Sequence, residues 1–189
     1  MENGFAVPCR CLIERRIAAN LPARYRNANL ADFSKQMGRL ATAWLAKPTD
    51  GLFIAGPVGA GKTHLAAAVF RDRAERRIGV TFRRCADFFR DLRETYRANW
   101  SEETVLEPLD QVRFLILDDL GAGSLSDHER RFTLELLDRR LNAVRPTLVT
   151  SNWNLEQIAE RMDDRIASRL SSFTAIELTG EDRRLRGAA

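Results

Sequence analysis

The sequence predicts a three-layer α/β fold in which helices cover both faces of a mostly parallel five-stranded sheet. Three observations carry this prediction: a glycine-rich motif joins an apolar segment to a helical one, five short apolar segments alternate with helical patterns, and acidic residues directly follow one buried segment. With 189 residues and 44% hydrophobic composition, the chain is long enough for one well-buried domain. Its composition excludes a disordered chain, and no apolar run reaches the roughly 20 residues of a membrane span.

Charge and cysteine content indicate the setting of the protein. A net charge of +4 suits an anionic partner, although scattered arginine often only solvates a surface. The three cysteines are too few for a disulfide framework, and Cys9 and Cys11 alone cannot close a four-ligand zinc site. We therefore expect a cytoplasmic protein with plain thiols.

The first part of the chain, residues 1–47, is expected to be an extension that ends in a packing helix. Apolar residues recur at helical spacing from Asp32 to Lys47, and Pro48 closes the segment. We expect this helix to pack on the domain that follows.

Residues 56–63 match the phosphate-binding pattern G-x-x-x-x-G-K-[ST]. An apolar strand at 52–55 precedes the motif and a helix beginning near Lys62 follows it, which is the context that the motif requires. Glycines let the backbone N–H groups face a phosphate chain; Lys62 is expected to reach the β and γ phosphates of ATP, and the Thr63 hydroxyl to hold Mg²⁺. The expected nucleotide contacts are Gly56, Pro57, Val58, Gly59, Ala60, Gly61, Lys62, Thr63 and His64.

A short strand at 80–82 and an amphipathic helix come next. One face of that helix is apolar and is expected to hold Cys85, Phe88, Phe89, Leu92 and Tyr96, while another carries Arg90, Arg93 and Arg97. The arginines could simply solvate a surface. Alternatively they could follow the backbone of single-stranded nucleic acid, with Tyr96 or Trp100 stacking on bases.

A run of four large apolar residues at 114–117 predicts a strand buried on both faces, and Asp118 and Asp119 follow it at once. Acids at the carboxyl end of such a strand lie where α/β folds bind ligands. Asp118 is therefore expected to take the Mg²⁺ of the nucleotide, and Asp119 to orient or deprotonate the attacking water.

The remaining segments complete the alternation. Ser126 and Glu129 form a capping box that starts a helix with Leu134, Leu137, Leu141 and Val144 at helical spacing, and His128 is expected on its surface. A buried strand at 147–150 ends near Asn152, which could hold the attacking water or the γ-phosphate, or could be a turn residue. A helix beginning at Asp163 or Asp164 places Arg165 and Arg169 on one face, and an edge strand follows at 175–178.

These motifs together resemble those of the AAA+ ATPases, most closely the DnaC/DnaI helicase-loader group and its transposition relative IstB. The resemblance extends from about Leu21 to Arg184. It is carried by GPVGAGKTHLA as Walker A, FLILDDLG as Walker B, LVTSN as sensor 1, DDRIASRL as the arginine-finger box, the closing ELTGEDRR and the lead-in LPARYRNANLADF.

The resemblance implies an AAA+ domain at 48–184, which a basic tail at 185–189 follows. In a departure from larger AAA+ proteins, the residues after Arg184 are too few for a helical lid. It implies that Asn152 is the sensor 1 residue and that Arg169, or as second candidate Arg165, is an arginine finger. Such a finger acts in trans, so a homo-oligomer with ATP between subunits is expected. By the same resemblance, the segment from Cys85 to Leu109 falls where the initiator and loader group carries an extra helix that faces single-stranded DNA.

Two features depart from the family pattern. Asp119 stands where many AAA+ enzymes have Glu, and the shorter side chain is expected to make hydrolysis slow. Fuller members carry a helicase-binding amino-terminal domain, often with a four-cysteine cluster ending in a C-x-C pair like Cys9 and Cys11. We expect that this chain begins inside that region.

Three functions compete at this point. The leading one is an ATP-driven adaptor of DNA replication that acts with a replicative helicase on single-stranded DNA. The second is an IstB-like transposition helper that binds duplex DNA and stimulates a transposase. The third, a small-molecule kinase, would need a lid over the phosphates, and the sequence shows no lid-like insertion.

Overall fold

A single five-stranded sheet forms the centre of the computed structural model, which describes residues 10–48, 51–123 and 125–179. Its order is β2-β3-β4-β1-β5 and every neighbouring pair is parallel, so the predicted sheet is confirmed and is wholly parallel. The strands are β1 (Leu52–Ala55), β2 (Val80–Arg84), β3 (Phe114–Leu120), β4 (Thr147–Ser151) and β5 (Thr174–Glu177). Cys9 and the expected tail at 185–189 lie outside the described residues.

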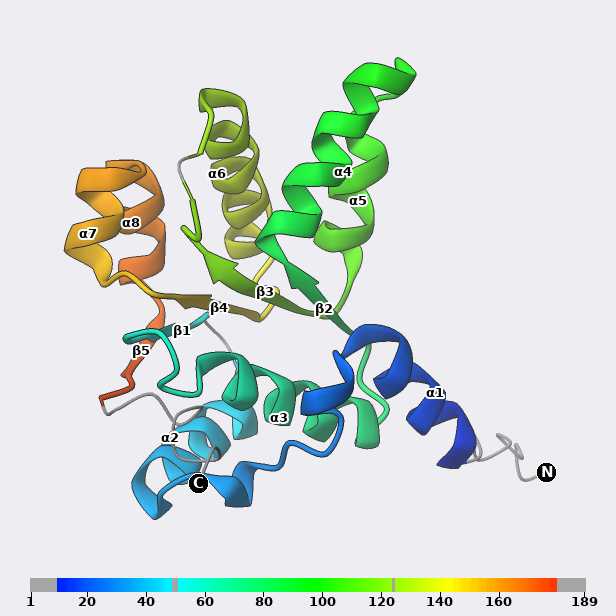
Figure 1. Ribbon diagram of the computed structural model, residues 1–189, viewed down its shortest axis with the longest axis vertical. Coiled ribbons are helices and arrows are strands. Elements are labelled where there is room, and N and C mark those ends of the chain that lie inside the picture. Colours follow the sequence, from blue (N-terminus) through cyan, green and yellow to red (C-terminus); the bar gives the residue numbers. More distant parts are fainter. Residues whose placement is uncertain (1–9, 49–50, 124, 180–189) are drawn as a thin grey trace, which may run out of the picture.

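Helices cover both faces of the sheet, which gives the three predicted layers (Figure 1). One layer contains α1 (Arg10–Asn20), α2 (Lys35–Ala46) and α3 (Lys62–Glu75), with the short 3-10 turns η1 (Ala23–Tyr25) and η2 (Leu30–Asp32). The other contains α4 (Cys85–Ala98), α5 (Glu103–Gln111), α6 (Asp127–Asn142), α7 (Leu155–Arg161) and α8 (Asp164–Ser171). Each layer buries its own apolar cluster against the sheet, as strands with two buried faces require.

The helix α1 was not predicted, because its sequence is rich in arginine and shows little apolar periodicity. Ile17 and Leu21 are nevertheless buried in the cluster that contains α3. The Arg16 guanidinium donates through Nη2 to the Val80 carbonyl at 2.8 Å, which joins α1 to the edge strand β2. This part of the chain therefore covers one exposed edge of the sheet.

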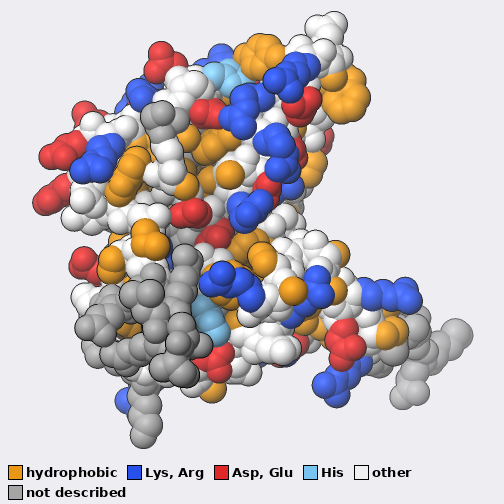
Figure 2. Space-filling view, viewed as in Figure 1, with side chains coloured by type: hydrophobic (Ala, Val, Ile, Leu, Met, Phe, Trp, Pro, Cys, Tyr) orange, Lys and Arg blue, Asp and Glu red, His pale blue; other side chains and the backbone are white. Residues whose placement is uncertain are grey.

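Two predicted helix faces were partly wrong. On α4, Tyr96 is 60% exposed and Thr95 is buried in its place, although Cys85, Phe88, Phe89 and Leu92 are buried as expected. Figure 2 shows basic side chains following this helix. On α6, the buried face holds Phe132, Thr133, Leu136 and Leu137, while Leu134 and Leu141 are only partly buried. Val144 lies beyond the end of the helix and is 65% exposed.

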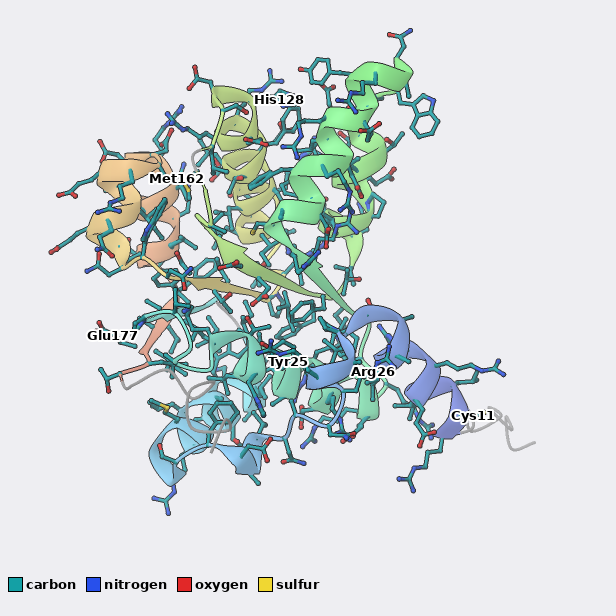
Figure 3. All side chains as sticks on the ribbon, in the orientation of Figure 1. Cys11, Tyr25, Arg26, His128, Met162 and Glu177 are labelled. Atoms are coloured by element: carbon teal, nitrogen blue, oxygen red, sulfur yellow. The ribbon has the colours of Figure 1, made fainter. Side chains whose placement is uncertain are left out.

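The histidine at the start of α6 is less exposed than expected. His128 keeps 21% of its side-chain surface exposed. Its ring makes edge-to-face contacts with Tyr96 and Phe132, with centroids 4.7 and 4.5 Å away. The contact with Tyr96 joins α4 to the first turn of α6, where Figure 3 labels His128. Within the described part of the chain, no helix has both the length and the apolar character needed to cross a bilayer.

Candidate nucleotide-binding site

The glycine-rich loop turns from β1 into α3 in the way that the motif predicts. Gly56 has a φ of +149°, and a side chain there would meet the Leu178 carbonyl at 2.4 Å. Gly61 is the N-cap of α3 with a φ of +101°, a left-handed conformation that residues with a side chain rarely adopt. Glycine at these positions therefore brings the loop back over the amino-terminal end of α3, where free N–H groups and the helix dipole favour an anion.

The loop's two functional side chains lie at the first turn of α3. Lys62 is 7% exposed, and its Nζ donates to the carbonyls of Gly56 and Pro57 at 2.8 Å each. Thr63 donates through Oγ1 to Oδ2 of Asp118 at 3.2 Å. An ammonium group is thus held at the mouth of the loop, and the hydroxyl faces the acidic end of β3.

A β-bulge in β3 separates the two aspartates, so that Asp119 lines the pocket and Asp118 contacts Thr63 in its wall. Pairing with β4 shifts between Leu117 and Leu120, where β3 has one residue more than its neighbour. Asp119 has a φ of 65° at this point. In a regular strand successive side chains point to opposite faces, whereas here Asp118 bonds Thr63 and Asp119 lines the same cavity.

The carboxyl group of Asp118 is buried, with 2% of its surface exposed. Its pKa is raised from 3.8 to about 6: burial is the main cause and the nearby Asp119 charge adds to it, while bonds from Thr150 and Thr63 and the Lys62 charge partly oppose the rise. Removing a carboxylate from water disfavours its charged form. A cation beside Asp118 would reverse this effect, so the group is suited to a metal ion.

A threonine that the sequence reasoning did not single out joins the two strand ends. The Thr150 hydroxyl donates to Oδ1 of Asp118 and accepts the Asp119 N–H, at 2.8 Å each. Asn152, which follows β4, donates through Nδ2 to Oδ1 of Asp119 at 3.2 Å. The position of Thr150, two residues before Asn152 on a strand beside the acids, was the available signal, but its apolar neighbours made it look like an ordinary strand residue.

Several of these groups line one cavity of about 570 Å³. Most of the predicted loop residues line it directly, whereas Gly56, Pro57 and Ala60 are not among its lining residues. The lining consists of Arg24, Tyr25, Val58, Gly59, Gly61, Lys62, Thr63, His64, Asp119, Ala122 and Asn152. Arg24 and Tyr25 come from the lead-in segment and were not predicted as site residues.

The lead-in segment is fastened to the site through His64. Its Nε2 lies 2.7 Å from Oδ2 of Asp32, and its ring meets the edges of Phe33 and Tyr25, with centroids 5.3 and 6.1 Å away. Figure 3 shows Tyr25 beside α3. The pKa of Asp32 is lowered by the bond to His64. Arg24 stacks over the Tyr25 ring, 4.5 Å from its centroid, and so the lead-in forms a wall of the cavity.

The residues present fit a nucleotide with Mg²⁺. Within the described ranges no cluster of three His, Cys, Asp or Glu side chains could hold a metal ion. Mg²⁺ does not need such a cluster, because it usually binds one or two protein oxygens together with substrate phosphates. Thr63 and Asp118 supply those oxygens, and Lys62 supplies the cation for the phosphates.

The two arginine-finger candidates lie on α8, and neither is among the residues lining the cavity of its own chain. Arg165 pairs with Asp163, the N-cap of its own helix, at 2.9 Å. Arg169 pairs through Nε with Asp138 of α6.

The arginines of α4 are also exposed, and each pairs with an acid. Arg90 pairs with Asp87 at 2.7 Å, Arg93 with Glu129, and Arg97 with Glu94 at 2.8 Å. The three arginine side chains are 57%, 55% and 76% exposed, whereas Glu129 is only 9% exposed. The guanidinium groups therefore remain accessible to an anionic partner.

Fold and site together define a P-loop nucleoside triphosphatase with an AAA+ core. A family model described as IstB-like ATP binding protein matches residues 18–176. The chain belongs to this family of IstB-like ATP-binding proteins.

Similar proteins carry two kinds of name. The chain is 32% identical over 116 residues to the replicative helicase loader DnaC of Escherichia coli K12, covering 61% of this chain and 47% of that protein. It is 28% identical over 145 residues to the insertion sequence IS1162 putative ATP-binding protein of Pseudomonas fluorescens, covering 72% and 62%. The crystal structure of DnaI matches with a TM-score of 0.74 and 27% identity, over 87% of this chain and 94% of that one. The chain spans about half the length of its DnaC relatives.

Proposed function

We propose that the protein is an ATP-hydrolysing adaptor of DNA replication that loads or remodels a replicative helicase on single-stranded DNA. The observation that carries the ATPase part is that Lys62, Thr63, Asp119 and Asn152 line one cavity, with Asp118 bonded to Thr63 behind its wall. The relatives named as helicase loaders support the replication part.

Each side chain of the site has a separate role in ATP hydrolysis. Bound ATP with Mg²⁺ supplies a γ-phosphoryl group that can be transferred to water. Lys62, which now donates to two loop carbonyls, would bind phosphate oxygens, and Thr63 and Asp118 would hold the cation. Asp119 and Asn152, already bonded to each other, orient the attacking water. The short arm of Asp119 makes this step slow.

The active form is a homo-oligomer with ATP between subunits. Arg169 and Arg165 both lie on the surface, apart from the cavity of their own chain, which supports a role at the site of a neighbouring subunit. Of the two, Arg169 is the finger. Arg169→Ala should lower turnover on the order of a thousandfold, because such a group stabilises charge that develops on the transferred phosphoryl. Unchanged turnover would refute this assignment.

The row of Arg90, Arg93 and Arg97 on α4 binds single-stranded DNA, with the exposed Tyr96 stacking on a base. Phosphates would replace the acids that these arginines now contact. Affinity should therefore fall with salt, and each arginine changed to Ala should reduce the slope of log affinity against log salt by about one. Equal slopes for the wild type and the three single variants would contradict this role.

The partner is tested by weighing complexes of the protein with the replicative helicase of its own host by mass photometry, with ATP, with ADP and with the Lys62→Ala variant. A complex that needs both ATP and Lys62 is expected. ATPase assays with Lys62→Ala and Asp118→Ala should show loss of a slow activity that single-stranded DNA stimulates. Absence of a helicase complex from protein that still binds ATP and single strands would refute the adaptor proposal.

A transposition helper is the second candidate, because the insertion-sequence ATP-binding proteins are also similar to this chain. It predicts preference for duplex over single-stranded DNA in a binding titration, the reverse of the adaptor. The Asp118-Asp119 pair favours the adaptor, since IstB relatives more usually show Asp-Glu. A kinase function would instead transfer the γ-phosphate to a metabolite rather than to water.

A further inference from the structure

The guanidinium group of the candidate finger Arg169 is hydrogen-bonded through Nε. Its Nε donates to Oδ1 of Asp138, an interaction that crosses from α8 to α6. Within the described part of the chain, neither of its two Nη groups makes a hydrogen bond. A guanidinium bound in this way presents both terminal nitrogens outward, which is the edge that binds a phosphate in two places.

The second arginine of α8 is held differently. Arg165 uses both Nε and Nη2 on the carboxylate of Asp163, which also caps the same helix. Its fork is therefore occupied by a neighbour two residues away. The positive charge of Arg165 also repels that of Arg169, which lies one turn further along the helix. Asp138 is the carboxylate that balances Arg169 and fixes its direction.

Asp138 stands on a rigid part of α6. Leu137 before it is 1% exposed, and Arg140, two residues after it, is completely buried. Arg140 donates to the carbonyls of Leu109, Asp110, Val112 and Pro146 and to the Thr147 hydroxyl, at 2.7 to 2.9 Å. A charge with this many partners resists displacement, so the turn that carries Asp138 has little freedom to move.

We infer that Asp138 is the positioning residue of the arginine finger: it holds Arg169 through Nε so that the Nη edge faces the nucleotide of the adjacent subunit. This inference rests on the proposed function, in which Arg169 acts in trans. Asp138 itself touches no nucleotide. Its loss should therefore misplace the finger without removing it, and a misplacement of about 1 Å can lower a rate on the order of a hundredfold.

Subunit mixing can test this role on each side of the interface separately. Asp119→Asn chains keep Arg169 but should not hydrolyse ATP, and Arg169→Ala chains should hydrolyse only when a neighbour supplies the finger. A mixture of the two is expected to regain ATPase activity. Asp138→Asn is then added to one partner at a time.

We expect Asp138→Asn to lower the activity of the mixture about 10- to 100-fold when it is placed in the Asp119→Asn partner, which supplies the finger. Placed in the Arg169→Ala partner, it should change nothing. Asp138→Glu, which keeps a carboxylate, should restore part of the activity. The matched control is Glu135→Gln on the same helix. The Glu135 side chain pairs with Arg139 and is 38% exposed, against 37% for Asp138. Glu135→Gln should change the ATPase activity of the mixture by no more than about twofold in either partner.

Three results would overturn the inference. An equal loss in both placements would mean that Asp138 only stabilises the fold. A rise in activity would mean that Asp138 sequesters the finger instead of positioning it. If the parent mixture regains no activity although both variants bind ATP and assemble, then Arg169 is not supplied in trans, and the proposed finger is refuted together with its positioning residue.

Discussion

The buried carboxyl of Asp118 should make the protein less stable than it would be without that charge. Asp118→Asn replaces the group with a neutral one of the same shape, and its amide can still accept from Thr150. In the folded protein the pKa is about 6, against 3.8 for the free group. The folded state thus holds the proton more tightly than the unfolded chain, and folding becomes less favourable as the pH rises from about 4 to about 6.

The size of the effect follows from that difference. About two pKa units correspond to about 3 kcal/mol of folding free energy, present below pH 4 and lost above pH 6. The amide has its own cost of burial, so we expect Asp118→Asn to raise the free energy of unfolding by about 1–3 kcal/mol at pH 8. For a chain of this size, each kcal/mol shifts Tm by about 2–4 °C.

Urea and thermal unfolding of both proteins, with a chelator and without nucleotide, measure this gain. The difference between wild type and Asp118→Asn should be largest at pH 8 and should vanish near pH 4. Glu107→Gln, which changes an exposed carboxylate, is the control and should show no such difference at either pH. An Asp118→Asn protein that is no more stable than wild type at pH 8, or a gap that persists at pH 4, would refute the reasoning.

Three further predictions concern the same region and its support. Thr150→Val removes the hydroxyl that joins Asp118 to the Asp119 N–H, so ATPase activity should fall about 10- to 100-fold while ATP binding is retained. Thr150→Ser keeps the hydroxyl and should keep most of the activity. An equal loss of activity in both variants would contradict this role. Arg140→Met leaves the buried carbonyls at 109, 110, 112 and 146 without their donor and should cost about 3 kcal/mol or more in urea unfolding, while a smaller loss would mean that water replaces it. Because the proton on Asp118 competes with Mg²⁺, the Mg²⁺ concentration for half-maximal ATPase activity should rise about tenfold for each pH unit below about 6, and a flat profile would exclude Asp118 as a ligand.

The strands and the loop were predictable from the sequence because their signals are local. Runs of large apolar residues without alternation define strands buried on both faces, and the glycines, Lys62 and Thr63 stand at fixed spacing. The helix α1 was not predictable in this way. Its burial depends on Ile17 and Leu21 meeting α3, a contact between distant segments that arginine-rich periodicity conceals.

It could also be predicted that Asp118, Asp119 and Asn152 lie close together, because a parallel sheet brings the carboxyl ends of its strands to one edge. The strand was expected to end before Asp118, whereas β3 extends to Leu120 and contains both aspartates. The part played by Thr150 could not be predicted, because it depends on the bulge that brings the Asp119 N–H to its hydroxyl. Tyr25 and Arg24 were missed for a related reason. The bond between Asp32 and His64 fixes the position of the lead-in, and the spacing of residues in the sequence does not predict this bond.

The opposite charges of the site explain how nucleotide binding can act on the whole domain. Lys62 and Asp118 are 7% and 2% exposed; the Lys62 ammonium donates to two loop carbonyls, and the Asp118 carboxylate accepts from two hydroxyls. Phosphates would meet the ammonium group and Mg²⁺ would meet the carboxylate, so nucleotide binding would bring a further opposite charge to each of these buried groups. Binding should therefore stabilise the fold by more than its contacts alone, since it also removes the cost that Asp118 imposes. The same ligand would connect β1, β3 and α3, because these elements carry the loop, the acids and the first turn of the helix.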